Sequence, residues 1–427
     1  MAVEAASPDL GGSTIVVSDL GVVERMLGFG AEGLRRCYQC GTCSVVCPRT
    51  PLEEAFPRKE MVWAQWGLED KLLADVDAWL CYQCNDCITH CPVDARPGDV
   101  MAATRDLQMA EYAVPKVMAR IAGDRRLLPV AAAIPAAIVA LLVACAFRFS
   151  KGPSGFPRGP VLFDHYINDG WIDLFTLTLV GVVAVLSYLS LRRFWGALDR
   201  SAPAGAQRRP LSRSIAGAVA DAFSHRGFDD CRTAHTRRWA HVGLFYGFLG
   251  LVAATTGAAI YTEIFPFLGI NWHDNKLSLP IWDPVKIVGN LGGAALLIGL
   301  GHTLWMRLKR RKTAGKSTYS DWFFSGLLGL TAITGFATEI LRFADRRTGA
   351  YLAYTVHLVF IFGLFAYFPF SKFSHAMYRT AALAFARQVG RAKPAPAGPA
   401  PGTHREPATS AGLSAATDRP GIPGGVP

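Results

Sequence analysis

Eight of the ten cysteines lie in two copies of one motif whose spacing suits iron–sulfur chemistry. Each copy has the pattern C-x2-C-x2-C-x3-C-P, in which x is any residue. The copies consist of Cys37, Cys40, Cys43, Cys47 and Pro48, and of Cys81, Cys84, Cys87, Cys91 and Pro92. Thiolates are suitable ligands for iron, and three of them two residues apart on a tight turn can reach three corners of one cubane cluster. The sequence therefore predicts two 4Fe-4S clusters.

The fourth cysteine of each motif is predicted to bind the other cluster, as it does in two-cluster ferredoxins. One cluster then takes Cys37, Cys40, Cys43 and Cys91, and the other takes Cys81, Cys84, Cys87 and Cys47. A zinc ribbon would need only four ligands, commonly in two C-x2-C pairs, and would leave the remaining cysteines and both prolines unexplained. A disulfide framework is disfavoured because C-x2-C spacing is typical of a metal site and because the chain is expected to begin in the cytoplasm.

The segment between the motifs, Leu52 to Trp79, is predicted to be mainly helical, with Pro57 as a start signal and apolar residues at helical spacing. A long helical insert favours a helical ferredoxin domain, which we place at residues 31–125, over the small β-rich type. Residues 1–30 lack a charged segment followed by an apolar one, so they are expected to form an N-terminal tail without a secretory signal. The clusters should therefore lie in the cytoplasm.

The remainder of the chain has the composition of a membrane protein. In the whole chain of 427 residues, 51% are apolar and only 18% are charged, so much of the apolar surface should face lipid. Six apolar segments reach the roughly 20 residues needed to cross a hydrocarbon core of about 30 Å. They cover residues 128–147, 171–191, 240–262, 284–306, 321–341 and 351–370. The net charge of +11 does not indicate nucleic-acid binding, because the Lys and Arg residues cluster between the apolar segments.

The basic residues also predict the topology. The turns after the second and fourth segments are rich in Arg and Lys, whereas the connections 263–283 and 342–350 are short and less basic. The positive-inside rule therefore predicts a multi-pass protein of the bacterial cytoplasmic (inner) membrane with its N-terminus inside. We divide this part into two transmembrane helices with a basic cytoplasmic loop at 126–235, a four-helix domain at 236–390, and a disordered cytoplasmic tail at 391–427, which is rich in Pro, Ala and Gly.

Histidines in the apolar segments are candidate haem ligands, because ionisable residues in lipid-spanning helices usually have a function. His357 and His375 are eighteen residues apart, which is five helical turns, so one continuous helix would present both on one face about 27 Å apart. Such a helix could hold two haems stacked across a bilayer, with Pro369 as a candidate kink. His241 and His375 have the same cytoplasmic depth and are predicted to bind an inner haem b. His357 falls in the outer third, and His302 lies near the inner end of the fourth segment.

The last four segments resemble the nitrate reductase gamma subunit family, a family of dihaem cytochromes b. Thr355 to His375 is similar to its last helix, Ala240-His241-Val-Gly-Leu-Phe to its first haem-bearing helix, and Leu279-Pro-Ile-Trp-Asp-Pro-Val-Lys286 to the segment with a quinol-contacting lysine. The resemblance implies that His241 and His375 bind the haem nearest the clusters, that His357 binds an outer haem, and that Lys286 lies at an outer quinone pocket. The second histidine of the family falls here on Leu251, so an outer haem would need another ligand such as His302, His165 or His273.

The N-terminal third resembles the C subunit of heterodisulfide reductase, and the membrane part resembles the E subunit of that enzyme. A fusion of the two is similar to the C-subunit family of the quinone-interacting membrane-bound oxidoreductase (Qmo) complex. That resemblance implies electron transfer between menaquinone and adenylylsulfate (APS) reductase through two partner subunits, Qmo subunits A and B, which carry FAD and iron–sulfur clusters. The expected fold is all-α, with a helical two-cluster ferredoxin domain followed by a six-helix transmembrane cytochrome b bundle.

Two functions of different classes fit these features. The first is a quinone-linked electron-transfer subunit. The second is a haem-containing membrane anchor that docks a soluble complex related to heterodisulfide reductase without reacting with quinone. A transporter is disfavoured because the sequence shows no inverted repeat and no broken helices. The chain also has neither the paired Cys-Cys-Gly motif of catalytic disulfide-reducing subunits nor a Rossmann glycine fingerprint, so flavin must be bound by another subunit of the complex.

Overall fold

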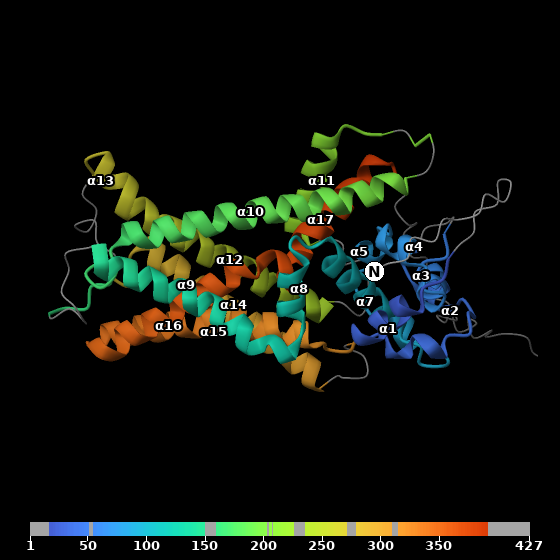
Figure 1. Ribbon diagram of the computed structural model, residues 1–427, viewed down its shortest axis with the longest axis horizontal. Coiled ribbons are helices and arrows are strands. Elements are labelled where there is room, and N and C mark those ends of the chain that lie inside the picture. Colours follow the sequence, from blue (N-terminus) through green and yellow to red (C-terminus); the bar gives the residue numbers. More distant parts are fainter. Residues whose placement is uncertain are drawn as a thin grey trace, which may run out of the picture.

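The structure is a computed structural model that describes residues 17–50, 54–149, 159–202, 205–206, 208–225, 235–270, 279–309 and 315–391. These residues form helices and turns without strands, which confirms the predicted all-α fold. The molecule is elongated: the short N-terminal helices gather at one end, which we call the ferredoxin end, and long helices run from there to the far end (Figure 1). The predicted tail, apart from Arg391, and His273 lie outside the described residues.

The ferredoxin part is built from short helices around one apolar core. They are α1 (Leu20–Gly28), α2 (Thr42–Val46), α3 (Arg58–Gln65), α4 (Glu69–Leu73), α5 (Asp77–Leu80), α6 (Asp86–Thr89) and α7 (Pro97–Tyr112). Helices α3, α4 and α5 lie in the segment between the motifs that was predicted to be mainly helical. Helix α1 lies within the predicted N-terminal tail, yet its Val22 and Met26 are fully buried with Leu34, Met61 and Leu72. The packed domain therefore begins before residue 31.

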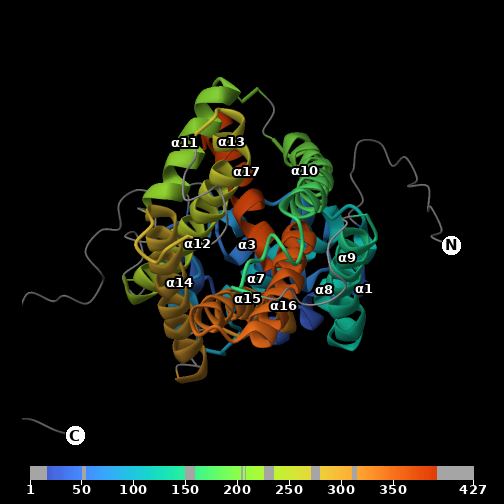
Figure 2. The ribbon, with the colours of Figure 1, turned by 90° about the vertical axis from the view of Figure 1, so that its left-hand side faces the viewer.

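Six helices are long and apolar enough to cross a membrane, as predicted. They are α9 (Leu128–Phe149), α10 (Asp169–Arg200), α12 (His235–Ala259), α14 (Pro284–Lys309), α15 (Tyr319–Phe343) and α16 (Arg347–Ala366). Seen from the far end, α9 and α10 lie on one side, α12 and α14 lie on the other, and α15 and α16 lie between them (Figure 2). The 3-residue α13 (Phe265–Phe267) follows α12, and α8 (Lys116–Gly123) connects α7 to α9.

The last predicted segment is wrong in one respect, because His357 and His375 do not share a continuous helix. Helix α16 ends at Ala366, two 3-10 turns follow, and α17 (His375–Gln388) begins at His375 itself. Pro369 has no N–H for an α-helical hydrogen bond, and the Ser371 side chain accepts from the Phe373 N–H to start the second turn. The five-turn spacing and the 27 Å separation therefore do not apply. His357 lies at the middle of α16, not in its outer third.

The ferredoxin part packs directly on the long helices through aromatic side chains. The Trp79 ring of α5 stacks on Tyr378 of α17 with ring centroids 5.5 Å apart, and the Phe194 ring of α10 meets Tyr378 edge-on at 5.2 Å. All three residues have an exposed fraction of 1% or less. Helix α11 (Leu211–Ser224) packs along the other side of α17. The apolar contact fixes how the two parts are oriented.

Buried carboxylates lie where the end of α17 meets the ferredoxin part. Glu60, Asp75 and Asp77 come close together, and burial raises the pKa of Asp75 to about 7. The Lys59 ammonium lies 2.6 Å from Asp77 and 3.5 Å from Glu60, and Arg391 reaches Asp77 at 2.5 Å. These two side chains supply the positive charge in the cluster. Arg391 thereby ties the end of the described chain back to the first third of the sequence.

Helices α12 and α14 approach each other closely because glycines face each other at their contact. A Cβ on Gly247 would lie 2.6 Å from the Leu296 backbone nitrogen, and one on Gly299 would lie 2.6 Å from the Ala240 carbonyl oxygen. Small residues of this kind allow transmembrane helices to pack backbone against backbone. Because α12 carries His241 and α14 carries Lys286, this contact fixes the relative depth of two predicted site residues.

Replacing Gly247 with valine should separate α12 from α14, because the new side chain would meet backbone atoms that cannot move out of its way. We expect a fall in thermal stability and loss of more than half of any bound haem, measured on detergent-purified protein. Gly181→Val on α10, where a Cβ has no neighbour within 4 Å, is the matched control. Equal stability of the two variants would contradict the close contact.

Candidate electron-transfer site

The two cysteine motifs adopt nearly the same backbone conformation. Gln39 and Gly41 in the first motif have φ values of 65° and 82°, and Gln83 and Asn85 occupy the same positions in the second with φ of 50° and 70°. Left-handed residues at these points turn the chain tightly between successive cysteines. Helix α2 then begins after Gly41 and α6 after Asn85, and the two helices pack against each other. The motifs thus form a pseudo-symmetric pair.

The structure brings the cysteines together in the two predicted sets. Cys91 lines the same small cavity as Cys37, Cys40 and Cys43. Burial, together with the nearby thiols of Cys81 and Cys84, raises the pKa of Cys47 to about 12. Such thiols are protonated at neutral pH, so iron binding must displace their protons. This proximity is what the crossed ligand sets require, and the sets themselves stay a prediction.

The second motif is held against the membrane helices by two arginines. Arg237 of α12 donates to the Gln83 carbonyl, and Arg379 of α17 donates to the Cys81 carbonyl at 3.0 Å. The Arg379 guanidinium also lies 4.2 Å from the centroid of the Tyr82 ring. Arg237 is four residues before His241, and Arg379 is four residues after His375. Each helix that carries a candidate ligand therefore contacts the second motif one turn away from its histidine.

The structure brings the rings of His241 on α12 and His375 on α17 together with their planes nearly perpendicular, at 79°. Their ring centroids are 6.3 Å apart. Metal–imidazole bonds are about 2 Å long, so two rings on opposite sides of one metal ion have centroids about 6 Å apart. The residue types and their separation fit the axial ligands of a haem iron, and this pairing stays a prediction.

A third histidine, His225, was not predicted as a site residue and fixes the orientation of His241. The Nδ1 atom of His225 lies 2.9 Å from the Phe223 carbonyl, and its Nε2 lies 3.0 Å from Nδ1 of His241. On the other side, Nδ1 of His375 lies 2.5 Å from the Lys372 carbonyl. A carbonyl can only accept, so His225 and His375 must donate through Nδ1, and His241 Nδ1 then donates to His225. Nε2 is left as the ligand atom on both candidate ligands.

The other predicted haem ligands are not paired in this way. His357 faces α15, where its Nδ1 lies 3.0 Å from the Thr334 hydroxyl and its ring packs on Gly335. The His302 ring lies beside Trp305 of its own helix, and His165 is exposed next to Asp164. Among the residues that the structure describes, no histidine ring contacts His357.

Lys286 lies near the start of α14, at the far end of the bundle. Its ammonium is 3.6 Å from a carboxylate oxygen of Glu339 on α15, and Asn290 donates to the same oxygen at 3.3 Å. Arg307, at the other end of α14, is twenty-one residues away, or about 31 Å along the helix axis. Lys286 and the cysteine motifs therefore lie at opposite ends of the membrane-spanning helices.

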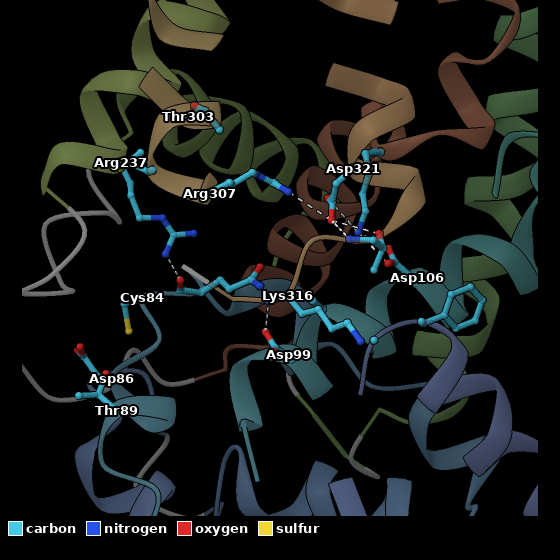
Figure 3. A pocket seen from close by; sticks show the side chains of 17 residues that line it. Cys84, Asp86, Thr89, Asp99, Asp106, Arg237, Thr303, Arg307, Lys316 and Asp321 are labelled. Carbon is cyan, nitrogen blue, oxygen red and sulfur yellow. Dashed lines mark hydrogen bonds and ion pairs between the residues drawn. The ribbon is translucent and has the colours of Figure 1, made fainter. Parts of the chain in front are cut away.

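A polar cavity of about 360 Å³ separates the second motif from the ends of α12, α14 and α15 (Figure 3). Cys84 and Arg237 line one side of it, and Arg307, Asp321 and Lys372 line another. Lys372 pairs with Asp106 of α7 at 2.6 Å, and Arg307 lies 3.4 Å from Asp321. The Lys372–Asp106 pair ties the ferredoxin part to the bundle beside the cavity, and the Arg307–Asp321 pair joins α14 to α15.

Comparison with known proteins identifies the family. The model of the family described as "Citrate utilization protein B" matches residues 158–397, which is more than half of the chain. The chain belongs to the citrate utilization protein B family. Citrate utilization protein B of Escherichia coli is 33% identical over 199 residues, which cover 45% of this chain and 49% of that protein. No solved structure matches the chain.

The N-terminal part has its own relatives. The family described as "4Fe-4S dicluster domain" matches residues 33–95, which confirms an iron–sulfur domain at the predicted place. A protein of Archaeoglobus profundus that is described as like the C subunit of heterodisulfide reductase is 39% identical over 94 residues, 22% of this chain and 50% of that protein. The C subunit of the H2:CoB-CoM heterodisulfide, ferredoxin reductase of Methanothermobacter marburgensis is 34% identical over 86 residues, 19% of this chain and 45% of that protein. The chain spans about half the length of the curated relatives it matches.

This member of the citrate utilization protein B family therefore has an iron–sulfur domain and six helices long and apolar enough to cross a membrane, as the sequence predicted. Sequence reasoning missed His225, Arg379 and Glu339 as site residues. Arg379 could have been found, because it is one helical turn from His375. His225 and Glu339 approach the site from other helices, and no local pattern marks them.

Proposed function

We propose that this protein carries electrons between a membrane quinone and a soluble oxidoreductase. In this proposal the cysteines hold two 4Fe-4S clusters in the crossed sets, His241 and His375 hold a haem b, and Lys286 lies at the quinone site. The proposal rests chiefly on the contact of the second motif with both helices that carry the histidine pair, made by Arg237 and Arg379. When bound, the clusters and the haem supply one-electron carriers.

The residues of this chain determine where those carriers lie. Arg237 and Arg379 fix the backbone of the second motif to α12 and α17, and the Trp79–Tyr378 stack excludes water from the same interface. His225 and the Lys372 carbonyl orient the two ligand rings. Few of these groups need to move during electron transfer, because they lie in or beside the packed interface.

The soluble partner is expected to meet the first motif. Cys40 is exposed, and Tyr38 beside it has an exposed fraction of 60%, so this motif faces away from the bundle. We propose flavin- and iron–sulfur-bearing partners like Qmo subunits A and B, with APS reductase as the terminal enzyme. The names of the relatives indicate two chemistries, because some are heterodisulfide reductase subunits and one is named for citrate utilization. The partner would then set the substrate, and this chain would supply the connection to the membrane.

The proposed orientation places the ferredoxin end in the cytoplasm and the bundle in the bacterial inner membrane, with menaquinone entering at the far end. The basic residues Arg307 and Lys309 at the ferredoxin end of α14 support it through the positive-inside rule. His357 remains a candidate ligand of a second haem. His302 and His165 do not contact His357, so neither is positioned to be the second ligand of that haem. The alternative function, a haem-containing anchor that docks a soluble complex, differs because its haem would not be reduced by quinol.

Replacing Arg379 with alanine tests the connection between the second motif and the histidine pair. The second motif would lose its hydrogen bond to α17, and small displacements of reacting groups are costly, so we expect electron transfer from pre-reduced clusters to haem to slow by about tenfold or more. The rate would be measured by stopped-flow spectroscopy, with haem and iron content unchanged.

Arg387→Ala is the matched control. Arg387 lies two turns further along α17 and pairs with Asp221 of α11 instead of the cysteine motif. Equal electron-transfer rates in the Arg379 and Arg387 variants would contradict the proposed route.

A further inference from the structure

The far end of the bundle contains a polar cluster that has more hydrogen-bonding capacity than its own contacts use. Lys286 and Asn290 are one turn apart on α14, and both contact the same oxygen, Oε1, of Glu339 on α15. The Lys286–Glu339 distance of 3.6 Å is an ion pair but too long for a direct hydrogen bond. Among the described residues, Oε2 of Glu339 accepts no hydrogen bond. The cluster can therefore bind a polar ligand without losing a strong contact of its own.

The cluster lies at a depth that a membrane-dissolved ligand can reach. Trp282, whose exposed fraction is 72%, lies in the turn just before α14, four residues before Lys286, and Trp is typical of the membrane–water interface. The side chains of Lys286 and Glu339 have exposed fractions of 26% and 14%, so they are partly covered but open to the outside of the bundle. Charged groups inside a membrane boundary are costly and usually mark a substrate or proton pathway.

Helix α15 also carries polar residues between this cluster and His357. Thr334, which contacts His357, is five residues before Glu339, or about 7.5 Å along the helix axis. Thr338 lies between them, and its hydroxyl donates to the Thr334 carbonyl. The polar groups of α15 therefore run from the far end towards the middle of the bundle.

We infer that Glu339 is the proton acceptor of a quinol bound at this cluster, and that Lys286 and Asn290 position the quinol oxygen beside it. This inference rests on the proposed quinone site and adds the group that handles the proton. Oxidation of one quinol breaks two O–H bonds and releases two protons and two electrons. Glu339 accepts the protons one at a time on Oε2 and returns each to water at the far surface. The electrons leave singly towards the one-electron carriers proposed above, of which the candidate haem at His357 would be the nearest.

The charges around Glu339 are compatible with this role. Lys286 approaches it from α14 and Arg342 from the next turn of α15, whereas Asp283, just before α14, lies near Lys286 and Tyr261. Arg342 donates to the Leu279 carbonyl at 3.5 Å, so it is anchored to the connection before α14. The ammonium and the carboxylate balance each other, so a neutral quinol can enter without adding an unpaired charge.

Glu339→Gln tests the inference, since it keeps the shape and the hydrogen-bond acceptor but cannot take up a proton. We expect the variant to bind a fluorescent hydroxyquinoline N-oxide analogue of menaquinol within threefold of the parent, as measured by fluorescence quenching. Its haem should still be reduced by dithionite. The rate of haem reduction by a menaquinol analogue should fall about 100-fold, the usual effect of losing a general base, and its rise with pH should disappear.

Glu339→Asp should recover part of the rate and the pH dependence, because it restores a carboxylate. Glu263→Gln, an exposed far-end carboxylate outside the cluster, should match the parent in every measurement. A quinol-driven rate within twofold of the parent in Glu339→Gln would overturn the inference. If Lys286→Met weakened analogue binding in that case, the proposed quinone site would still stand. If neither variant changed binding or rate, both the inference and the quinone site at this end would be wrong.

Discussion

His375→Ala is expected to abolish the low-spin haem b spectrum completely while leaving the iron–sulfur clusters in place. In the structure His375 and His241 are the only described histidines whose ring centroids have the separation of about 6 Å that suits one iron between them. Two imidazole ligands give a six-coordinate, low-spin haem, and the loss of either leaves an open position. His241→Ala should have the same effect. The measurement is the optical spectrum of reduced protein together with a pyridine haemochrome assay.

His302→Ala provides the control, because His302 lies on a different helix and its ring contacts Trp305 of the same helix. That variant should retain the full haem content. An unchanged low-spin spectrum in both His241→Ala and His375→Ala would show that the haem lies elsewhere. A spectrum lost in the His302 variant as well would indicate a general effect on bundle stability and not ligation.

The second large effect is expected at the crossed cysteines. Cys47→Ser should remove or convert the cluster held mainly by the second motif, and Cys91→Ser should affect the cluster held by the first. The physical reason is proximity: Cys91 shares a cavity with Cys37, Cys40 and Cys43, and Cys47 lies beside Cys81 and Cys84. Electron paramagnetic resonance of the reduced variants, with iron analysis, would separate the two signals.

Cys145→Ser is the matched control, since Cys145 lies within α9 and away from both motifs. It should leave both cluster signals intact. If Cys47→Ser altered only the signal of the first-motif cluster, each motif would hold its own cluster and the crossed sets would be wrong. Cys47→Ser and Cys91→Ser should also differ in their effect on haem reduction, because Arg237 of α12 and Arg379 of α17 hydrogen-bond to the second motif.

The two cysteine variants therefore report on different steps of the proposed route. Loss of the second-motif cluster should stop electrons at the first motif, whereas loss of the exposed first-motif cluster should prevent their entry from a soluble donor. Dithionite, a small chemical reductant, should still reduce the haem in either case. This contrast would distinguish an electron-transfer subunit from a membrane anchor.

The sequence by itself determined the features that depend on near neighbours along the chain. Cluster chemistry follows from cysteines two or three residues apart, because one turn must bring three thiolates to one cluster. The six long helices follow from the length and hydropathy of each segment. The matched depth of His241 and His375 also follows, because each lies at one end of an apolar segment and successive segments run in opposite directions.

The tertiary structure alone decided which helix faces which, because hydropathy gives the depth of a residue but not the rotation of its helix. The close approach of Gly247 to Leu296 sets how α12 packs on α14. The break after Ala366 places His357 and His375 on two different helices, so their spacing along the chain does not give their relative orientation. The His225–His241 contact and the Lys286–Glu339 pair join residues on different helices. Such pairings depend on side-chain packing between distant segments, and no local pattern in the sequence contains that information.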